Sequence, residues 1–223
     1  MNREAGRPGA TGPPLRVDAE RNRDRILVAA REAFAVRGLD VPMEEVARRA
    51  GVGVATLYRR FPSRSELIAG AFEAKMAAYA EAVEQALAEP DAWVGFAGYV
   101  ERVCAMQAED RGFTNVLTMT FPSCKAFEAA RDRSHAGLVQ LIERAKAISK
   151  LRTDFVPEDL VMVLMANAGV VSATGDAAPD AWRRLVAYLL QAFAAPNAEP
   201  LPEPPTPSQM YRALLRARAP DAG

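Results

Sequence analysis

Cysteine and histidine are scarce in this chain. Its 223 residues include one histidine, His135, and two cysteines, Cys104 and Cys124. Two cysteines fit a reducing cytoplasm better than a disulfide framework, and they do not have zinc-ligand spacing with His135. The sequence also contains neither a nucleophile elbow nor a phosphate-binding loop. We therefore expect no metal, no cofactor and no catalytic residues, so the chain is not expected to be an enzyme.

Long hydrophobic stretches are absent as well. The longest apolar run, residues 160–171, has about half of the roughly 20 residues that a membrane-spanning helix needs. Residues 1–15 are polar and rich in glycine and proline, without the apolar centre of a signal peptide. The sequence therefore predicts a soluble, cytoplasmic protein with no membrane partner.

The two ends of the chain differ in charge, although the formal net charge is zero. Residues 1–70 hold 13 arginines and nine acidic residues, which gives +4 there and −4 in the remainder. All 13 cations are arginine, which suits planar contacts with phosphate or guanine. The chain thus joins a basic N-terminal module to an acidic body.

Helical periodicity dominates the sequence, and no segment alternates convincingly as a strand does. At this length, with half of its residues hydrophobic, the chain can bury one substantial core plus a small module. A disordered arm of about 18 residues is expected before a first helix that ends at Gly38. The helices expected in the later part of the chain span residues 63–87, 92–108, 122–130, 131–150, 157–173, 179–194 and 208–218.

Two short helices joined by a glycine turn are the most informative part of the sequence. The first spans residues 43–50, and Gly51 follows it where the chain must turn sharply. On the second helix, Leu57 and Phe61 lie four residues apart and share a buried face. The outward residues, which include no carboxylate, are Ala55, Thr56, Arg59 and Arg60. This layout is that of a helix-turn-helix, which places its second helix in the major groove of DNA.

A purely structural interpretation of this motif is the alternative. Helix-glycine-helix arrangements occur in many helical domains, and an arginine pair on a short helix is often a solvated face. The run Gly51-Val52-Gly53 imitates the start of a nucleotide-binding loop, but no strand precedes it and the third glycine is missing. The agreement of the buried positions, the turn glycine and the arginine face favours DNA binding.

Residues 41–64 read VPMEEVARRAGVGVATLYRRFPSR. This segment resembles the DNA-binding domain of the tetracycline-repressor-like (TetR) transcriptional regulators. The resemblance is specific over about residues 21–72, and Thr56-Leu57-Tyr58 followed by Phe61 is its most characteristic element. It implies a helical homodimer that binds a double-stranded DNA operator and responds to a small molecule.

The resemblance also implies roles for individual side chains. Tyr58 would donate its hydroxyl to a phosphate, and Arg64 would clamp another phosphate from the start of the next helix. The residues that would meet base edges or nearby phosphates are Val54, Ala55, Thr56, Arg59 and Arg60. Family members often carry Ser or Thr where this chain has Pro42, and Ser where it has Gly53. Those hydroxyl contacts are unavailable here, so arginine must supply more of the affinity.

The last two long helices are expected to form the dimer interface. Residues 160–171 are apolar almost all round, and such a helix needs partners on every side. A wide apolar stripe follows the next helix from Trp182 to Phe193. We expect both helices to pair with their symmetry mates, through Leu164, Val171, Trp182, Leu185, Val186, Leu189 and Phe193. The alternative is that both helices line the core of a single chain.

The middle of the chain, residues 96–167, is the candidate effector pocket. It offers polarizable methionines and aromatic rings, together with a few polar groups that would orient a ligand. The candidate lining residues are Phe96, Tyr99, Met106, Phe113, Met119, Phe121, Phe127, His135, Met162 and Asn167. Each of these taken singly is more often ordinary core. The effector is expected to be a small apolar or amphipathic molecule.

The sequence thus predicts an all-α, homodimeric transcriptional regulator that acts as a repressor on a palindromic operator. Its expected divisions are an arm at 1–18, a three-helix helix-turn-helix domain at 19–66, an effector-binding and dimerisation domain at 67–196, and a Pro-rich linker with a short helix at 197–223. An effector among the central helices would tilt the long helix and release DNA. The alternatives are a helical adaptor or small-molecule-binding protein without sequence-specific DNA binding, and a helical enzyme, which the lack of an acid–base pair disfavours.

Overall fold

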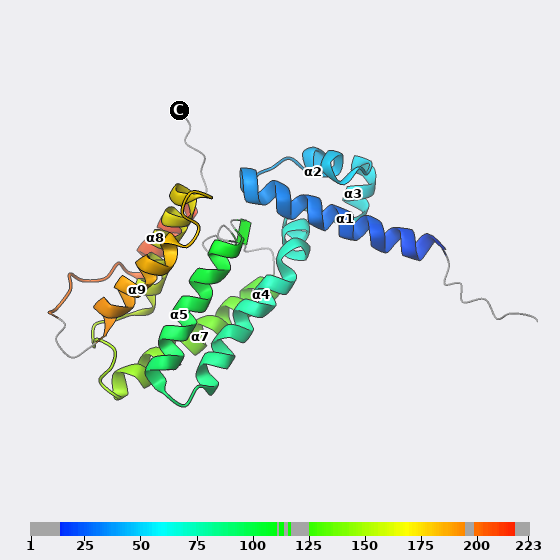
Figure 1. The fold of residues 1–223 in the computed structure, drawn as a ribbon. Coiled ribbons are helices and arrows are strands. Elements are labelled where there is room, and N and C mark those ends of the chain that lie inside the picture. Colours follow the sequence, from blue (N-terminus) through cyan, green and yellow to red (C-terminus); the bar gives the residue numbers. More distant parts are fainter. Residues whose placement is uncertain (1–13, 111, 114–115, 117–124, 195–198, 217–223) are drawn as a thin grey trace, which may run out of the picture.

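The computed structural model describes residues 14–110, 112–113, 116, 125–194 and 199–216, and over this part the chain is helical, without strands. Figure 1 shows a small N-terminal group of helices beside a larger helical body, as the sequence predicts. No helix in these ranges is long and apolar enough to cross a membrane. The helices are α1 (Pro14–Arg37), α2 (Met43–Ala50), α3 (Val54–Arg60), α4 (Arg64–Ala88), α5 (Ala92–Glu109), α7 (Lys125–Ala147), α8 (Pro157–Thr174), α9 (Ala181–Phe193) and α10 (Pro207–Arg216).

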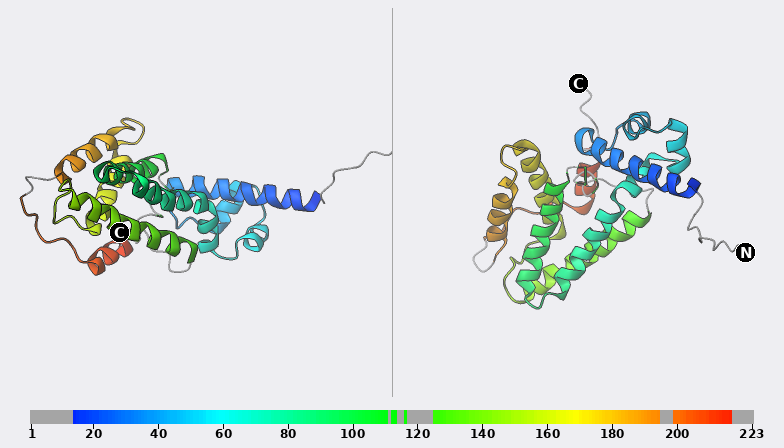
Figure 2. Two further views of the ribbon diagram at one scale, coloured as in Figure 1. Left: turned by 90° about the horizontal axis from the view of Figure 1, so that it is seen from below. Right: turned by 45° about the vertical axis from the view of Figure 1, so that its right-hand side comes forward.

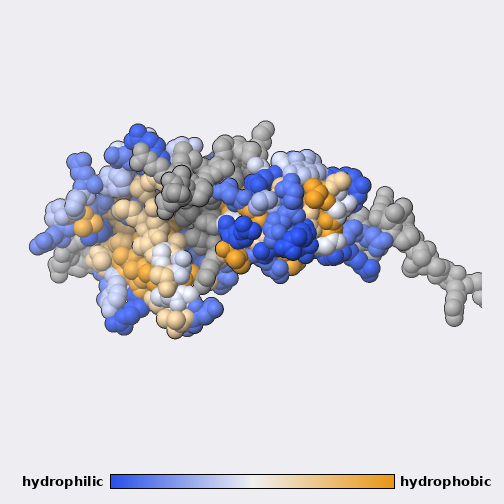
Figure 3. Space-filling view, turned by 90° about the horizontal axis from the view of Figure 1, so that it is seen from above, coloured by the Kyte–Doolittle hydropathy of each residue, from blue (hydrophilic) through white to orange (hydrophobic). Residues whose placement is uncertain are grey.

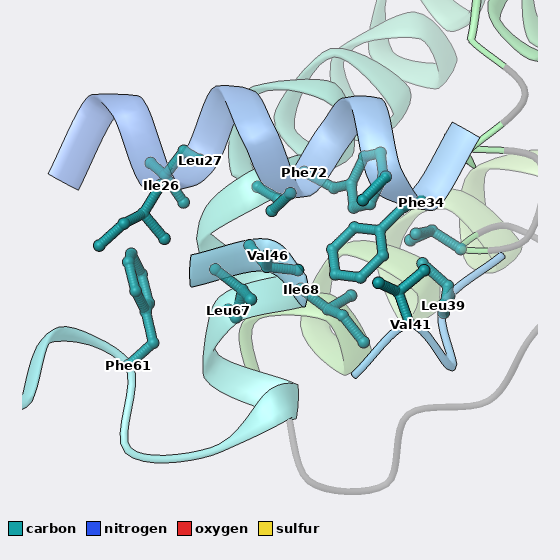
Figure 4. Close-up of a cluster of buried hydrophobic side chains, with 14 of the residues drawn as sticks. Ile26, Leu27, Phe34, Leu39, Val41, Val46, Phe61, Leu67, Ile68 and Phe72 are labelled. Atoms are coloured by element: carbon teal, nitrogen blue, oxygen red, sulfur yellow. The ribbon is translucent and has the colours of Figure 1, made fainter. Parts of the chain in front are cut away.

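The N-terminal core forms where α1, α2 and α3 meet the first turns of α4 (Figure 4). Phe34 of α1 stacks on Phe72 of α4 with 6.1 Å between the ring centroids. Val46 and Leu57, one from each short helix, are completely buried. Ala47 is also fully buried, and its small side chain lets the two helices approach closely. The buried face expected for Leu57 and Phe61 is confirmed, because Phe61 is buried as well.

The N-terminal core does not stop at the expected domain boundary after residue 66. It continues along α4 through Phe72, Met76 and Ala80. From the body it takes in five further buried side chains, which are Met106, Phe113, Val116, Phe127 and Ala130. Helix α4 therefore supplies buried side chains to both halves of the protein, because the rest of its length, from Ala82, lines the core of the body.

The body packs α4 against α7 and α5, with α8 and α9 on the far side of α5 (Figure 2). Its core is rich in aromatic side chains in edge contact. The ring of Phe155 lies 5.2 Å from that of Phe96 and 4.9 Å from that of Phe193, measured between centroids. Arg144 of α7 donates to the carbonyls of Leu87 and Glu89 at 2.6 and 2.7 Å, which satisfies exposed acceptors at the end of α4.

Two expected helix boundaries are wrong. Helix α1 begins at Pro14, so the expected arm through residue 18 is too long. Proline is well tolerated at the first position of a helix, where its missing N–H is not needed. The helices expected at 122–130 and 131–150 are one helix over the described residues, α7, because neither proline nor glycine falls near residue 130 to stop it.

The C-terminal segment is held against the body by the loop between α7 and α8. Arg152 donates to the Glu199 carbonyl at 2.7 Å, and the Leu201 N–H donates to the Asp154 carboxylate at 3.1 Å. The neighbouring Arg152 guanidinium holds the pKa of Asp154 well below its usual range. Helix α10 then contacts α8, with Met210 buried. The role of this tail is open from its composition, and the structure docks its described residues on the body.

Gly137 fixes the distance between α4 and α7, and this predicts a stability effect. A Cβ at Gly137 would overlap both methyl groups of Val83, which is itself buried in the core. We expect Gly137→Ala to lower the free energy of unfolding by about 1–3 kcal/mol through overpacking. Gly98→Ala is the matched control, since nothing lies within 4 Å of a Cβ there.

Gly98→Ala should raise the free energy of unfolding by about 0.5–1 kcal/mol, the usual gain of a helical Gly→Ala change. Both variants are compared by urea denaturation at one protein concentration, because the stability of any protein that self-associates depends on its concentration. Equal effects of the two substitutions would show that α4 and α7 separate easily at this crossing.

Candidate nucleic-acid interface

Helix α3 presents the predicted reading face to solvent. Leu57 points inward and is completely buried, whereas Val54 and Tyr58 are 39% and 42% exposed. Thr56 is half-buried, and the remaining outward residues, which are all exposed, are Ala55, Arg59 and Arg60. Neither Arg59 nor Arg60 appears in an ion pair among the described residues. Their charges are available to an anionic partner.

The turn before α3 depends on glycine. Gly51 has φ 63° and ψ 37°, the left-handed conformation that ends α2, and its N–H donates to the Ala47 and Arg48 carbonyls. The next N–H, from Val52, also donates to the Ala47 carbonyl, at 3.1 Å. A residue with a Cβ is strained in this conformation, so glycine sets the angle between the two helices.

Both helices of the motif begin without a side-chain cap. Pro42 stands at the N-cap of α2 and Gly53 at the N-cap of α3, and neither supplies a capping hydrogen bond. Serine or threonine at such a position accepts a hydrogen bond from a backbone N–H in the first turn. The first turns of α2 and α3 therefore receive no such bond from their N-cap residues.

Arg64 makes contacts within the protein that the sequence did not predict. Its Nη1 donates to the Leu39 carbonyl at 2.9 Å and also to the Val41 carbonyl. These bonds tie the first turn of α4 to the loop between α1 and α2. The guanidinium is half-buried and partly engaged within the protein, and its contact with a DNA phosphate stays a prediction.

The acidic residue nearest the turn is neutralised within α2. Glu45 accepts hydrogen bonds from Arg48 at 2.7 and 2.8 Å and from Arg49 at 2.8 Å. The Arg48 guanidinium, followed by that of Arg49, lowers the Glu45 pKa to about 2. The carboxylate stays ionised and paired at neutral pH, so the motif keeps its positive character beside α3.

Two arginines of α1 lie beside the motif, and the sequence analysis did not single them out. Arg23 lies over the Phe61 ring, 5.8 Å from its centroid, and Arg25 is close to the Gly51 carbonyl, with 3.4 Å between Nη2 and the oxygen. Only the general excess of arginine pointed to them. Their position is set by how α1 crosses the motif, which local periodicity does not encode.

The candidate effector residues do not form one pocket. Phe96 and Tyr99 lie in the body core, whereas Met106, Phe113 and Phe127 belong to the N-terminal core. His135 is exposed on α7 and lies in neither core. Asn167 is completely buried, and Met162 is 41% exposed on the rim of an apolar groove of about 250 Å³ that Leu201 also lines. Met119 and Phe121 lie outside the described residues.

Most of the expected dimer residues pack inside their own chain. Leu164, Trp182, Val186 and Phe193 are between 1% and 9% exposed and join the body core. The half-buried members are Val171, Leu185 and Leu189. The apolar stripe of α9 faces α5, because the body needs that face to close its own core.

A different apolar surface is exposed on α8 and α9. Figure 3 shows an apolar area on the left-hand part of the molecule, where Figure 1 places these two helices. Met165 is 37% exposed and Tyr188 is 54% exposed. The other exposed residues of this surface, which we call the outer face, are Met162, Ala166, Gly169 and Ala187.

A hydroxyl at the α3 N-cap should stabilise the reading helix. Gly53 has extended φ and ψ angles that any residue can adopt, and a Cβ there would meet only Thr56 Oγ1, at 3.9 Å. We expect Gly53→Ser to raise the free energy of unfolding by about 0.5–1 kcal/mol relative to Gly53→Ala. The comparison separates the cap from the effect of a Cβ alone. Equal stability of the two variants in urea denaturation would mean that the first turn of α3 does not accept a serine cap.

The comparisons with known proteins agree with this geometry. Residues 26–71 match the family described as bacterial regulatory proteins, tetR family, and no curated protein matches the sequence significantly. The regulator PfmR from Thermus thermophilus is 20% identical, with a TM-score of 0.55 over 75% of this chain and 98% of that chain. The ketosteroid regulator KstR2 of Mycobacterium tuberculosis is 14% identical, with a TM-score of 0.59 over 78% and 95%.

FadR from Bacillus subtilis, solved in complex with stearoyl-CoA, is 16% identical, with a TM-score of 0.51 over 75% of this chain and 95% of that chain. At these identities the likeness shows a shared fold. The match at residues 26–71 covers the turn glycine, the buried positions and the exposed arginine face described above. The chain therefore carries a tetR-family DNA-binding domain and has the fold of TetR-family transcriptional regulators.

Proposed function

We propose that this protein is a cytoplasmic, homodimeric repressor that binds a palindromic operator and leaves it when a small molecule binds the body. The observation that carries the proposal is the exposed, unpaired arginine face of α3 within a tetR-family domain. Arg59 and Arg60, together with Val54, Ala55 and Thr56, would meet base edges or nearby phosphates in the major groove. Tyr58 would donate its exposed hydroxyl to a phosphate.

The outer face of α8 and α9 is the proposed dimer interface. Ala166 and Gly169 are small and lie beside Met165 on exposed α8, which allows a second helix to approach closely. The α8 part of the outer face carries no charged residue, so a symmetry mate would meet an apolar helix there, and on α9 the Arg184 guanidinium lies over the Tyr188 ring, 4.9 Å from its centroid. Two recognition helices about 34 Å apart would then read successive major grooves.

The end of α5 is the proposed link between effector and DNA. Asp110 forms an ion pair with Lys75 of α4 at 3.2 Å, and the rings of Phe113 and Phe72 lie 6.2 Å apart. A Cβ at Gly112 would lie 3.1 Å from the Phe72 ring and 3.3 Å from the Ala35 backbone nitrogen. This segment touches both α1 and α4, so a shift of α5 would reorient α3. A regulator of the same fold, FadR, holds stearoyl-CoA, which supports a ligand-responsive body.

In vitro selection from random duplex DNA tests the reading face. The parent chain should enrich a palindrome. Arg59→Ala and Arg60→Ala should each relax base preference at particular positions, because a bidentate arginine–base pair contributes about 1–3 kcal/mol of discrimination. Arg133→Ala, an exposed arginine of α7, is the control and should leave the preference unchanged.

Unchanged preference in both α3 variants would mean that another surface reads the bases. No enriched sequence, from folded protein at low salt, would favour the helical adaptor without sequence-specific DNA binding. Salt must be kept low because phosphate contacts weaken steeply with ionic strength.

A charge placed on the outer face tests the dimer. Met165→Glu should raise the dimer dissociation constant by at least about 100-fold, because it buries an unpaired carboxylate in each protomer. Val139→Glu on α7 is a matched control, since Val139 is 38% exposed and Met165 is 37% exposed. Sedimentation velocity over a concentration series measures both. A Met165→Glu variant that dimerises as the parent does would place the interface elsewhere.

A further inference from the structure

Three helices of the body bury polar atoms that make no hydrogen bond of normal geometry, although two of them, on Tyr99 and Ser134, interact with each other and with Tyr79. They are Tyr99 Oη on α5, Ser134 Oγ on α7 and Asn167 Oδ1 on α8. Tyr99 is 1% exposed, and Ser134 and Asn167 are fully buried. Leaving such groups unpaired costs stability, and most buried polar groups in folded proteins are satisfied. Each of these atoms is therefore a candidate for contact with something other than this chain.

The orientation of Asn167 is defined by its partners. Its Nδ2 donates to the Cys104 carbonyl at 3.2 Å and to Gln107 Oε1 at 2.9 Å. A backbone carbonyl can only accept, so the amide nitrogen must face it. The Asn167 oxygen consequently points elsewhere, and it can be satisfied only by a donor.

A cluster of three hydroxyls, those of Tyr79, Tyr99 and Ser134, lies nearer the start of α5 than Cys104 does. The rings of Tyr79 and Tyr99 are 6.5 Å apart, and Ser134 is the third member. Burial raises the pKa of Tyr79 and raises that of Tyr99 well above its usual value, so both phenols are neutral at pH 7. The cluster can donate to an acceptor. From Tyr99 to Cys104, which Asn167 contacts, α5 rises about 7.5 Å at 1.5 Å per residue.

The surroundings of these groups disfavour an ionised ligand. Among the described residues, the only charged side chain that is buried is Arg152, which is paired with Asp154 in the α7–α8 loop. Arg131 lies near Tyr79, but it is half-buried and donates to the Val116 carbonyl. An ion brought into this interior would lose its hydration without an adequate counter-charge.

We propose that the effector is a neutral molecule with an apolar body, which donates a hydrogen bond to Asn167 Oδ1 and accepts one from the Tyr99–Ser134 hydroxyl cluster. This proposal rests on the function proposed above and assigns the chemical class of its effector. The three groups are closed to solvent, so entry of the ligand separates α5 from α7 and α8. Tyr79 carries that movement to α4, because it lies on α4 beside Tyr99.

Three probes on one aromatic frame test the ligand class by calorimetry with the full chain. They are 4-(hydroxymethyl)benzophenone, which is neutral and has a donor and an acceptor, 4-benzoylbenzoate, which is anionic, and 4-benzyltoluene, which is a hydrocarbon. The neutral hydroxyketone should bind most tightly. Tighter binding of the benzoate, or no binding of the hydroxyketone, would overturn the proposal.

A double variant, Tyr99→Phe with Ser134→Ala, tests the residues. These hydroxyls interact only within their own cluster and without normal hydrogen-bond geometry, so their removal should leave the melting temperature close to that of the parent. The affinity for the hydroxyketone should fall about tenfold, and that for 4-benzyltoluene should not change. Tyr211→Phe, at an exposed tyrosine of α10, is the control. Parental affinity in the double variant, or a clear fall in its melting temperature, would show that these hydroxyls serve the fold alone.

The selected duplex separates this inference from the proposed function. If the parent binds no specific duplex, the repressor function fails, whereas the calorimetric ranking still decides the ligand class. If the duplex binds and the hydroxyketone releases it from the parent but not from the double variant, both are supported. If the duplex binds and the hydroxyketone does not bind the chain, only the ligand class is wrong.

Discussion

Helix α4 packs into both cores of this protein, and the other features depend on that sharing. Its first turns bury Leu67, Ile68 and Phe72 among the helices of the DNA-binding module. Its last turns bury Val83 and Ala86 in the body. A helix of 25 residues transmits a tilt from one end to the other, because close-packed interiors deform little. A ligand that moves the body end of α4 must therefore move α3.

Contacts at both ends of α4 reinforce this coupling between the body and α3. Gly137 of α7 brings the body close to Val83, and Arg144 satisfies the carbonyls at the end of the helix. Arg64 ties its beginning to the loop between α1 and α2. The Phe34–Phe72–Phe113 ring series connects α1, α4 and the segment after α5. Packed side chains and hydrogen bonds thus connect the body to the module that contains α3.

The interior of the body has a different balance of interactions. A core chosen for stability alone would replace Tyr99 and Ser134 with apolar residues, since their hydroxyls make no hydrogen bond of normal geometry. Binding sites commonly retain such groups at the expense of stability. The tail segment that Arg152 and Asp154 hold lies at the opposite end of α8, where Leu201 covers apolar surface. The proposed ligand contacts and the tail contacts therefore lie in different parts of the body.

The sequence by itself determined the helical class, the helix-turn-helix and the outward residues of α3. These are local properties: a turn glycine such as Gly51 and four-residue spacings such as Leu57 and Phe61 act within two turns of helix. Only the tertiary structure decided what each buried face meets. Periodicity shows that the Trp182 stripe is buried, but burial against α5 and burial against a second copy require the same pattern. The bonds from Arg64 to the Leu39 and Val41 carbonyls likewise come only from the tertiary structure, because hydrogen bonds over 20 or more residues depend on how helices cross.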